Sequence, residues 1–242
     1  MSKVIAVLGN TGSGKSMFSC ILAKMLTNEK QKAIIINADN CTPMFPVWLP
    51  EQVIKSNSSI GQLLSEAELS AALVASKVII LKSHPFIGLM GYVNNENPSS
   101  YPNLKQDMMI PLIATAACLV DFVILDCSSD MLNRFTSACI EHADVVIQIL
   151  TPDLKGISYF SSHQEFFGCT HPKKSEYFAL AGMARPFHAV KEIGHLIGGF
   201  DGLLPYIKEI DRCAAEGKMF EAIEYCSSKY LSSIDNVLEV VQ

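Results

Sequence analysis

The sequence has little charge and few of the residues that build metal centres. Only 18% of its 242 residues are Asp, Glu, Lys or Arg, and Trp occurs once. No Cys-x-x-Cys pair occurs, and no Cys and His residues have the spacing of a zinc site. Because 49% of the residues are apolar or aromatic, the composition excludes a disordered chain, which would be poor in such residues.

The sequence also lacks a basic excess and a long apolar run. Its 19 basic and 24 acidic residues give a net charge of −5, which argues against binding nucleic acid or anionic lipid through bulk charge. The longest apolar stretch, residues 108–125, is broken by Pro111 and Asp121, so it is a poor membrane span. Several of the eight cysteines lie in apolar runs, where Cys behaves as a small hydrophobe. We therefore expect a cytoplasmic protein with reduced cysteines.

Short apolar runs alternate with helical patterns along the chain. This order predicts an α/β fold, a doubly wound and mostly parallel sheet with helices on both faces, in one domain spanning residues 1–242. We expect strands at residues 4–8, 33–37, 78–81, 121–126, 144–150 and 177–181. We expect helices at residues 15–26, 60–73, 108–119, 131–142 and 154–167, a loop at 88–105, and a mostly helical chain after Pro186.

A phosphate-binding motif lies between the first strand and the first helix. The segment is Gly9-Asn10-Thr11-Gly12-Ser13-Gly14-Lys15-Ser16 and matches G-x-x-x-x-G-K-[ST]. Its glycines let successive backbone N–H groups turn toward phosphate oxygens, and the following helix adds its positive N-terminal end. Lys15 is expected to reach the β and γ phosphates, and Ser16 to bind Mg²⁺. Together with Met17, these residues are the expected site for ATP or ADP.

Two acidic residues follow strands that should end at the same edge of the sheet. Asp126 ends the strand at 121–126, where it can hold Mg²⁺ through a water molecule; the alternative is a helix N-cap. Asp39 follows the strand at 33–37 and can orient an attacking water molecule or form an Asx turn.

Several further segments, in order along the chain, carry a family resemblance. Residues 34–39 (IIINAD) resemble a second strand that normally ends Asp-x-Asp, and residues 121–129 (DFVILDCSS) and 143–152 (ADVVIQILTP) resemble two later strands. Residues 203–206 (LLPY) and 213–218 (CAAEGK) complete the pattern. With the phosphate motif, the chain resembles the MinD/ParA group of P-loop ATPases, of the SIMIBI class, over nearly its whole length.

The resemblance implies an ATPase that converts ATP and water to ADP and phosphate with Mg²⁺. Lys15 and Asp39 would be catalytic, Ser16 and Asp126 would serve the metal, and Pro205 would lie near the adenine. Residues 128–133 would sense the γ phosphate. Members of the group are switches that position or regulate a protein assembly or cargo, so the resemblance also implies a protein partner and a nucleotide-dependent homodimer.

The chain departs from the family pattern at three positions. The signature lysine, which reaches across a dimer to the partner's nucleotide, is replaced by Asn10, a glycine by Thr11, and the first Asp of Asp-x-Asp by Asn37. A missing cation removes transition-state stabilisation, so we expect weak or partner-stimulated hydrolysis unless another cation such as Arg134 substitutes. Pilus-locus members of the group also depart from the lysine pattern.

Two other functions fit the same scaffold. One is a small-molecule kinase or ATP-dependent ligase, whose acceptor pocket could be lined by the 84–105 region with His84, Tyr92 and Asn94. The other is an adaptor that binds nucleotide without turnover. Residues 234–242 have apolar spacing with two acids and no base, so we expect this segment to pack on the domain or a partner rather than on a membrane.

Overall fold

The computed structural model describes residues 2–49, 58–102, 104, 108–170 and 177–241, and of residues 165–170 the backbone alone. The described residues form one sheet of eight strands in the order β3-β4-β2-β5-β1-β6-β7-β8. Only β3 and β4 pair antiparallel. The strands are β1 (Lys3–Gly9), β2 (Ala33–Asn37), β3 (Ile79–Ile80), β4 (Ile87–Gly91), β5 (Phe122–Asp126), β6 (Val145–Leu150), β7 (Tyr177–Ala184) and β8 (Gly202–Pro205).

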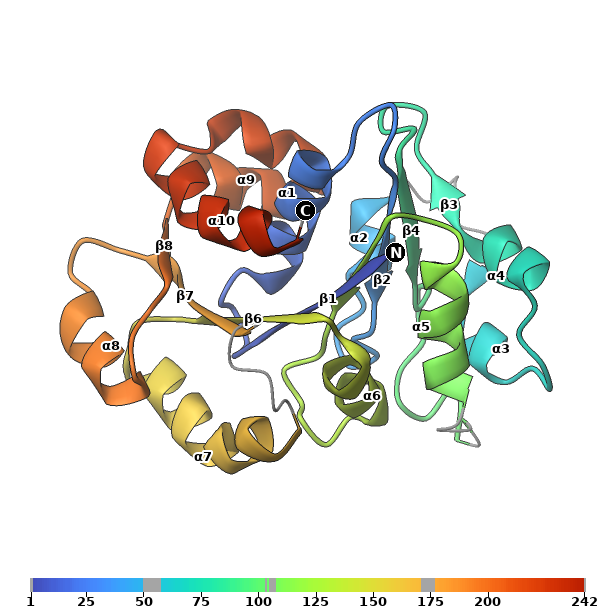
Figure 1. Cartoon of the computed structure of the whole chain (residues 1–242), viewed down its shortest axis with the longest axis horizontal. Coiled ribbons are helices and arrows are strands. Elements are labelled where there is room, and N and C mark those ends of the chain that lie inside the picture. The colour runs from blue at the N-terminus through green and yellow to red at the C-terminus, as the bar shows by residue number, and fades with distance from the viewer. Residues whose placement is uncertain (1, 50–57, 103, 105–107, 171–176, 242) are drawn as a thin grey trace.

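Helices cover both faces of this sheet (Figure 1), as the sequence predicts. One apolar cluster joins the sheet to α1 (Lys15–Leu26), α2 (Phe45–Trp48), α9 (Lys208–Ala215), the 3₁₀ helix η5 (Met219–Tyr225) and α10 (Ser228–Val241). A second cluster lies on the other face, against α3 (Ile60–Leu64), α4 (Ala71–Lys77), α5 (Met109–Ala117), α6 (Arg134–His142) and α7 (Leu154–Thr170). A further helix, α8 (Val190–Ile197), connects β7 and β8. The architecture is therefore the α/β sheet expected from the sequence.

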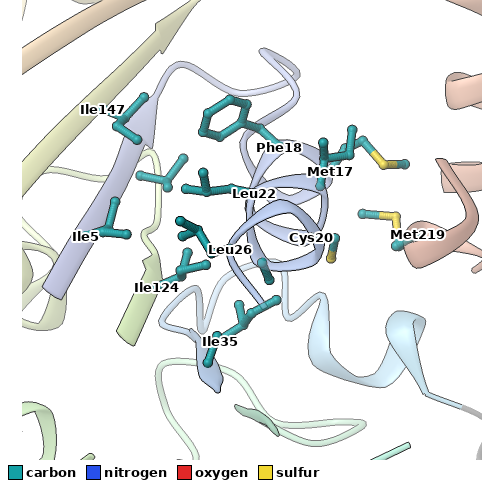
Figure 2. Packing of buried hydrophobic residues seen from close by; sticks show 14 of the residues in the cluster. Ile5, Met17, Phe18, Cys20, Leu22, Leu26, Ile35, Ile124, Ile147 and Met219 are labelled. Carbon is teal, nitrogen blue, oxygen red and sulfur yellow. The ribbon is translucent and has the colours of Figure 1, made fainter. Parts of the chain in front are cut away.

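Helix α1 is fixed against the middle of the sheet by one apolar face. Phe18, Leu22 and Leu26 follow a four-residue spacing, are fully buried and point toward the sheet strands (Figure 2). Burying side chains of this size stabilises the fold by roughly 1.5–3 kcal/mol each. This packing holds the start of α1, and so the loop that precedes it, at the carboxyl edge of the parallel strands.

Two strands lie where the sequence analysis expects other structure. β4 (Ile87–Gly91) occupies part of the expected loop at 88–105, so that prediction was wrong there. Gly88 and Gly91 suggest a turn, but here they allow close packing: a Cβ on Gly88 would lie 2.5 Å from Val78 Cγ1, and one on Gly91 2.3 Å from Phe45 Cβ. β8 (Gly202–Pro205) likewise interrupts the region expected to be helical.

The helix expected at residues 60–73 is two short helices. α3 ends at Leu64, and α4 begins after Ser70, whose Oγ accepts a hydrogen bond from Leu73 N at 3.2 Å. This N-cap starts a new helix rather than continuing the old one. At the other end of the chain, Ile234, Val237 and Val241 of α10 are buried in the core, which confirms that this segment packs on the protein.

No helix in the described part of the chain is long and apolar enough to span a membrane.

Candidate nucleotide-binding site

The phosphate motif forms a curled loop between β1 and α1. Gly9, Gly12 and Gly14 have φ values of 145°, 78° and 93°, a region that L-residues with side chains rarely adopt. A Cβ on Gly9 would also lie 1.8 Å from Ile149 O, so only glycine fits there. The Ser13 hydroxyl is buried and has no hydrogen-bond partner among the described residues. The loop thus has the shape of a phosphate cradle that opens into a 12-residue helix.

Lys15 is held inside this loop. Its Nζ donates to Gly9 O at 3.1 Å, Asn10 O at 3.3 Å and Ser129 Oγ at 2.7 Å. Burial lowers the pKa of Lys15, while the negative charges of Asp126 and Asp39 oppose that effect. The structure therefore brings the motif lysine into direct contact with the 128–133 segment.

Asp126 lies at the end of β5 next to the first turn of α1. Its Oδ2 accepts hydrogen bonds from Ser16 Oγ at 2.8 Å and from Asn37 Nδ2 at 2.9 Å. Burial raises the pKa of Asp126 to about 6, against the effects of the Ser16 hydrogen bond and the Lys15 charge. The N-cap of α6 is Asn133, so Asp126 does not take the helix-capping role that was its alternative.

The donor set around Asp126 fits Mg²⁺. Asp126 Oδ1 is buried and has no hydrogen-bond partner within the described ranges, and the Ser16 hydroxyl lies beside the same carboxylate. Mg²⁺ prefers oxygen ligands and keeps several waters, with one or two protein groups and substrate phosphates completing its shell. No group of three or more His, Cys, Asp or Glu side chains in the described residues could hold a metal ion, so the donors here would be Asp126, the Ser16 hydroxyl, phosphate and water.

Comparisons with known proteins identify the fold, although no family model matches the chain. An uncharacterised ATP-binding protein of Methanocaldococcus jannaschii is 24% identical, with 86% of each chain covered. The structure of a ParA family ATPase from Chlorobium tepidum superposes with a TM-score of 0.80 at 16% identity, covering 98% of this chain and 99% of that one. MinD from Pyrococcus horikoshii, complexed with Mg-ADP, gives a TM-score of 0.70 at 13% identity, covering 99% and 96%.

The chain has the ParA/MinD fold. A MinC:MinD complex from Aquifex aeolicus contains the same fold, with a TM-score of 0.72 at 12% identity, covering 98% of this chain and 95% of that one. At these identities the likeness is one of fold, and the roles of individual residues rest on the geometry of this chain.

The ParA/MinD fold places Asp39 just beyond β2, near the phosphate loop. Its Oδ1 accepts backbone hydrogen bonds from Cys41 N at 2.9 Å and Thr42 N at 3.0 Å, which is the Asx turn expected as one alternative. Its charge also acts on Lys15. The next residue, Asn40, accepts a hydrogen bond from Asn133 Nδ2 at 3.0 Å, so this loop is joined to the 128–133 segment.

Asn10, at the position of the signature lysine, points inward. It is only 1% exposed. Its Nδ2 donates to Thr151 Oγ1 at 2.9 Å, and its Oδ1 accepts from Thr151 N at 3.0 Å. Asn10 therefore ties the phosphate loop to the end of β6, with its side chain turned into the protein rather than toward solvent. Thr11, beside it, is exposed.

Met17 and Pro205, the two remaining expected nucleotide contacts, lie on different elements: Met17 is in α1, and Pro205 is the last residue of β8. The Met17 side chain lies in the core toward Met219 (Figure 2), so only its backbone N–H can face a nucleotide. Pro205 of β8 pairs with Ala184 of β7. The preceding Met183 has a φ of 53°, and its Cγ would lie 3.5 Å from a Cβ on Gly14.

Met183, which the sequence analysis missed, brings β7 and β8 beside the phosphate loop. Its unusual backbone lies between Ala181 and Ala184, where the pairing of β7 with β8 shifts register. An apolar residue at the end of a strand gives no sequence signal for such a bulge, because nothing in its type requires a positive φ. The sequence analysis named Ser129 only as part of the 128–133 segment. Its hydrogen bond with Lys15 identifies it as the residue of that segment that contacts the motif lysine.

Proposed function

We propose that this chain is a cytoplasmic ATP-binding switch of the ParA/MinD kind that hydrolyses ATP slowly and regulates or positions a protein assembly. The observation that carries the proposal is the hydrogen bond from Lys15 Nζ to Ser129 Oγ. It links the expected phosphate-binding lysine to a segment that could respond to the γ phosphate.

Each residue has a distinct part in this proposal. The loop N–H groups and Lys15 bind the phosphates, Ser16 ligates Mg²⁺, and Asp126 holds a metal-bound water. The metal neutralises phosphate charge when bound. Asp39 orients the attacking water molecule through the carboxylate oxygen that is not used in its turn.

Competition for Lys15 provides the switching step. A γ phosphate is a stronger acceptor for an ammonium group than a neutral hydroxyl is, so its arrival would draw Lys15 away from Ser129. The 128–133 segment would then rearrange, and the loop after β2 would follow through the Asn133–Asn40 hydrogen bond. Two loops would therefore respond to a single phosphate.

Slow hydrolysis follows from the inward position of Asn10. Because its amide bonds Thr151, the chain supplies no cation at the position from which the signature lysine acts. Charges of that kind are worth roughly 10³–10⁵-fold in rate in related phosphoryl-transfer enzymes. A protein partner that supplies a cation would then stimulate turnover.

Exposed apolar side chains near the phosphate loop support a protein partner or a second copy. Leu132, Leu154 and Phe187 are 88%, 83% and 77% exposed and follow β5, β6 and β7, whose carboxyl ends share one edge of the sheet. Contiguous exposed apolar patches mark interaction sites, and a partner seated on this edge of the sheet would cover all three side chains. The MinC:MinD complex is a precedent for a protein partner, whereas the net charge of −5 gives no support for DNA or membrane.

The proposal is tested by measuring nucleotide binding and phosphate release with Mg²⁺ and ATP. We expect Lys15→Ala to weaken ATP binding by at least tenfold, because it removes the only motif cation that contacts phosphate. We expect Asp39→Ala to retain ATP binding and lose most of the turnover. Unchanged binding in Lys15→Ala would contradict the assigned site, and measurable binding without turnover in the native chain would favour an adaptor.

A small-molecule kinase or ligase is the second candidate, and a cavity favours it. Tyr92 lines a cavity of about 280 Å³ beside Asn40 and Asn133. His84 instead lines a separate pocket with Lys24 and Ser83, and Asn94 lines neither of these two. A phosphorylated small molecule detected by ³¹P NMR would establish this function, whereas free phosphate alone supports the switch.

A further inference from the structure

The cavity beside Tyr92 has a polar wall formed by the two loops next to the phosphate site. The loop after β2 contributes Asn40, and the segment after β5 contributes Asp130, Asn133 and Arg134. Its volume of about 280 Å³ is slightly below the usual range of ligand pockets, roughly 300–1,000 Å³. The size therefore suits a ligand smaller than a nucleotide.

The polar wall presents one charge of each sign. Asp130 and Arg134 are both exposed, and no ion pair joins them within the described part of the chain. Asp130 Oδ1 accepts a hydrogen bond from Leu132 N at 2.9 Å, which leaves its second oxygen available. Arg134 presents several donors in a planar fork that suits a carboxylate. Two unpaired opposite charges on one wall match a zwitterion.

The opposite wall is apolar and aromatic. It consists of Tyr92, Pro98, Tyr101, Pro102, Leu104 and Met109. The Tyr101 hydroxyl donates to Glu96, so this polar group already has a partner within the protein. Such a wall accommodates an aliphatic or aromatic group of modest size.

Tyr92 adds a polar group that its surroundings leave unused. It is only 1% exposed, burial raises the pKa of its hydroxyl, and no hydrogen bond of that hydroxyl occurs to any described residue. Tyr92 lines the cavity, so a ligand there would supply a hydrogen-bond partner for this hydroxyl.

We propose that this cavity binds an α-amino acid with an apolar side chain. Arg134 receives the carboxylate, Asp130 receives the ammonium group, and the side chain packs against the tyrosine and proline wall. Tyr92 donates its hydroxyl to the ligand. The free amino acid is the ligand, rather than a chain end, because only the free molecule carries both charges next to one side chain.

The position of the cavity couples this ligand to the nucleotide, and this step rests on the proposed function. The hydrogen bond between Asn133 and Asn40 joins the two loops that form the polar wall. The same loops carry Ser129, which accepts a hydrogen bond from Lys15, and Asp39, whose charge acts on Lys15. A ligand that orders both loops reduces the ordering that ATP must still induce, so the two ligands bind with positive cooperativity.

The site is tested by titrating the nucleotide-free chain with L-phenylalanine and L-leucine by calorimetry. We expect saturable binding of both, and at least fivefold weaker binding of glycine, of 3-phenylpropionate and of phenethylamine, which lack the side chain, the ammonium group and the carboxylate respectively. Arg134→Gln should weaken L-phenylalanine binding at least fivefold, and Tyr92→Phe should weaken it to a smaller extent. Arg212→Gln, another exposed arginine, is the matched control and should bind as the native chain does.

Three results would overturn the proposal: no saturable binding of either amino acid, equal binding of glycine, or native binding by Arg134→Gln. The coupling is tested separately by measuring ATP affinity with saturating L-phenylalanine, where we expect about a fivefold gain. An unchanged ATP affinity would refute the coupling. Failure of ATP binding itself would refute the proposed function while leaving the amino-acid titration, made without nucleotide, as an independent result.

Discussion

Asp126 is fully buried beside Ser16 and Asn37, and its ionised carboxylate lowers the stability of the folded protein. An Asp whose pKa is raised from 3.8 to about 6 destabilises the folded state by about 3 kcal/mol above pH 6. The sign follows from proton binding: the folded state holds the proton more tightly, so stability falls as the pH rises from about 4 to 6. A bound metal ion would offset this cost.

Replacing Asp126 with Asn should therefore stabilise the nucleotide-free protein. The amide oxygen can still accept hydrogen bonds from Ser16 and Asn37, while the buried charge is removed. We expect the free energy of unfolding at pH 8 to rise by about 1–3 kcal/mol, and Mg²⁺-dependent ATP binding to weaken. Urea unfolding at pH 4 and pH 8 checks this, because the gain should be small at pH 4. A loss of stability at pH 8 would contradict the raised pKa.

Asn37 shows why an amide suits this position better than the Asp of the family pattern. Its Nδ2 donates to Asp126, while its Oδ1 accepts from Met44 N at 2.9 Å. An Asp at position 37 could still accept the hydrogen bond from Met44 N, but its negative charge would lie beside that of Asp126. Repulsion between two neighbouring carboxylates raises the pKa of one of them. The amide thus keeps Asp126 more easily ionised.

Among the elements, β4 depends on glycines that the sequence analysis assigned to a loop. Gly91 lies at the end of β4, where its missing side chain lets α2 pack against the strand. Gly91→Ala would place a Cβ 2.3 Å from Phe45 Cβ, and we expect a loss of about 1–3 kcal/mol from overpacking. Thermal and urea unfolding of the purified variant measure this loss.

Gly194→Ala is the matched control for that substitution. Gly194 lies inside α8, and a Cβ there would be 3.4 Å from Phe200 Cδ2, an ordinary contact. Alanine is favoured over glycine inside a helix by about 1 kcal/mol, so this variant should be slightly more stable. If Gly91→Ala were as stable as Gly194→Ala, the close packing of α2 on β4 would be wrong.

The elements also show how far the sequence predicts the fold. β1, β2, β5 and β6 were predicted because continuous apolar runs of this length are typical of buried parallel strands. β4 and β8 were not, since their glycines serve contacts with distant residues such as Phe45 and Ser233. The phosphate loop was predictable because its residues follow a fixed local spacing. The Asn10–Thr151 contact joins positions far apart in sequence, so neither residue type predicts it.

At the scale of the whole molecule, one edge of the sheet collects the site and the exposed apolar groups. The phosphate loop, the loop after β2, the 128–133 segment and Met183 all lie where the parallel strands end, the usual ligand-binding edge of an open α/β sheet. Leu132, Leu154 and Phe187 follow strands that end there too. A partner that covers these side chains would therefore touch the segments that we propose respond to nucleotide.

ATP should consequently control association through this edge. We expect Mg²⁺ and ATP to promote self-association of the Asp39→Ala chain, and we expect Leu154→Asp to weaken it at least tenfold while ATP binding by the monomer is retained. An Asp at the first residue of α7 is compatible with the helix dipole, so the fold should be preserved.

Ile80→Asp is the control: Ile80 is 58% exposed but lies on β3, where it pairs with Gly88 near the amino end of β4. Analytical ultracentrifugation with and without ATP distinguishes the cases. Equal weakening by both variants would show that general surface hydrophobicity drives association, whereas an effect of Leu154→Asp alone would locate the interface beside the phosphate loop, because only that residue shares an edge with it.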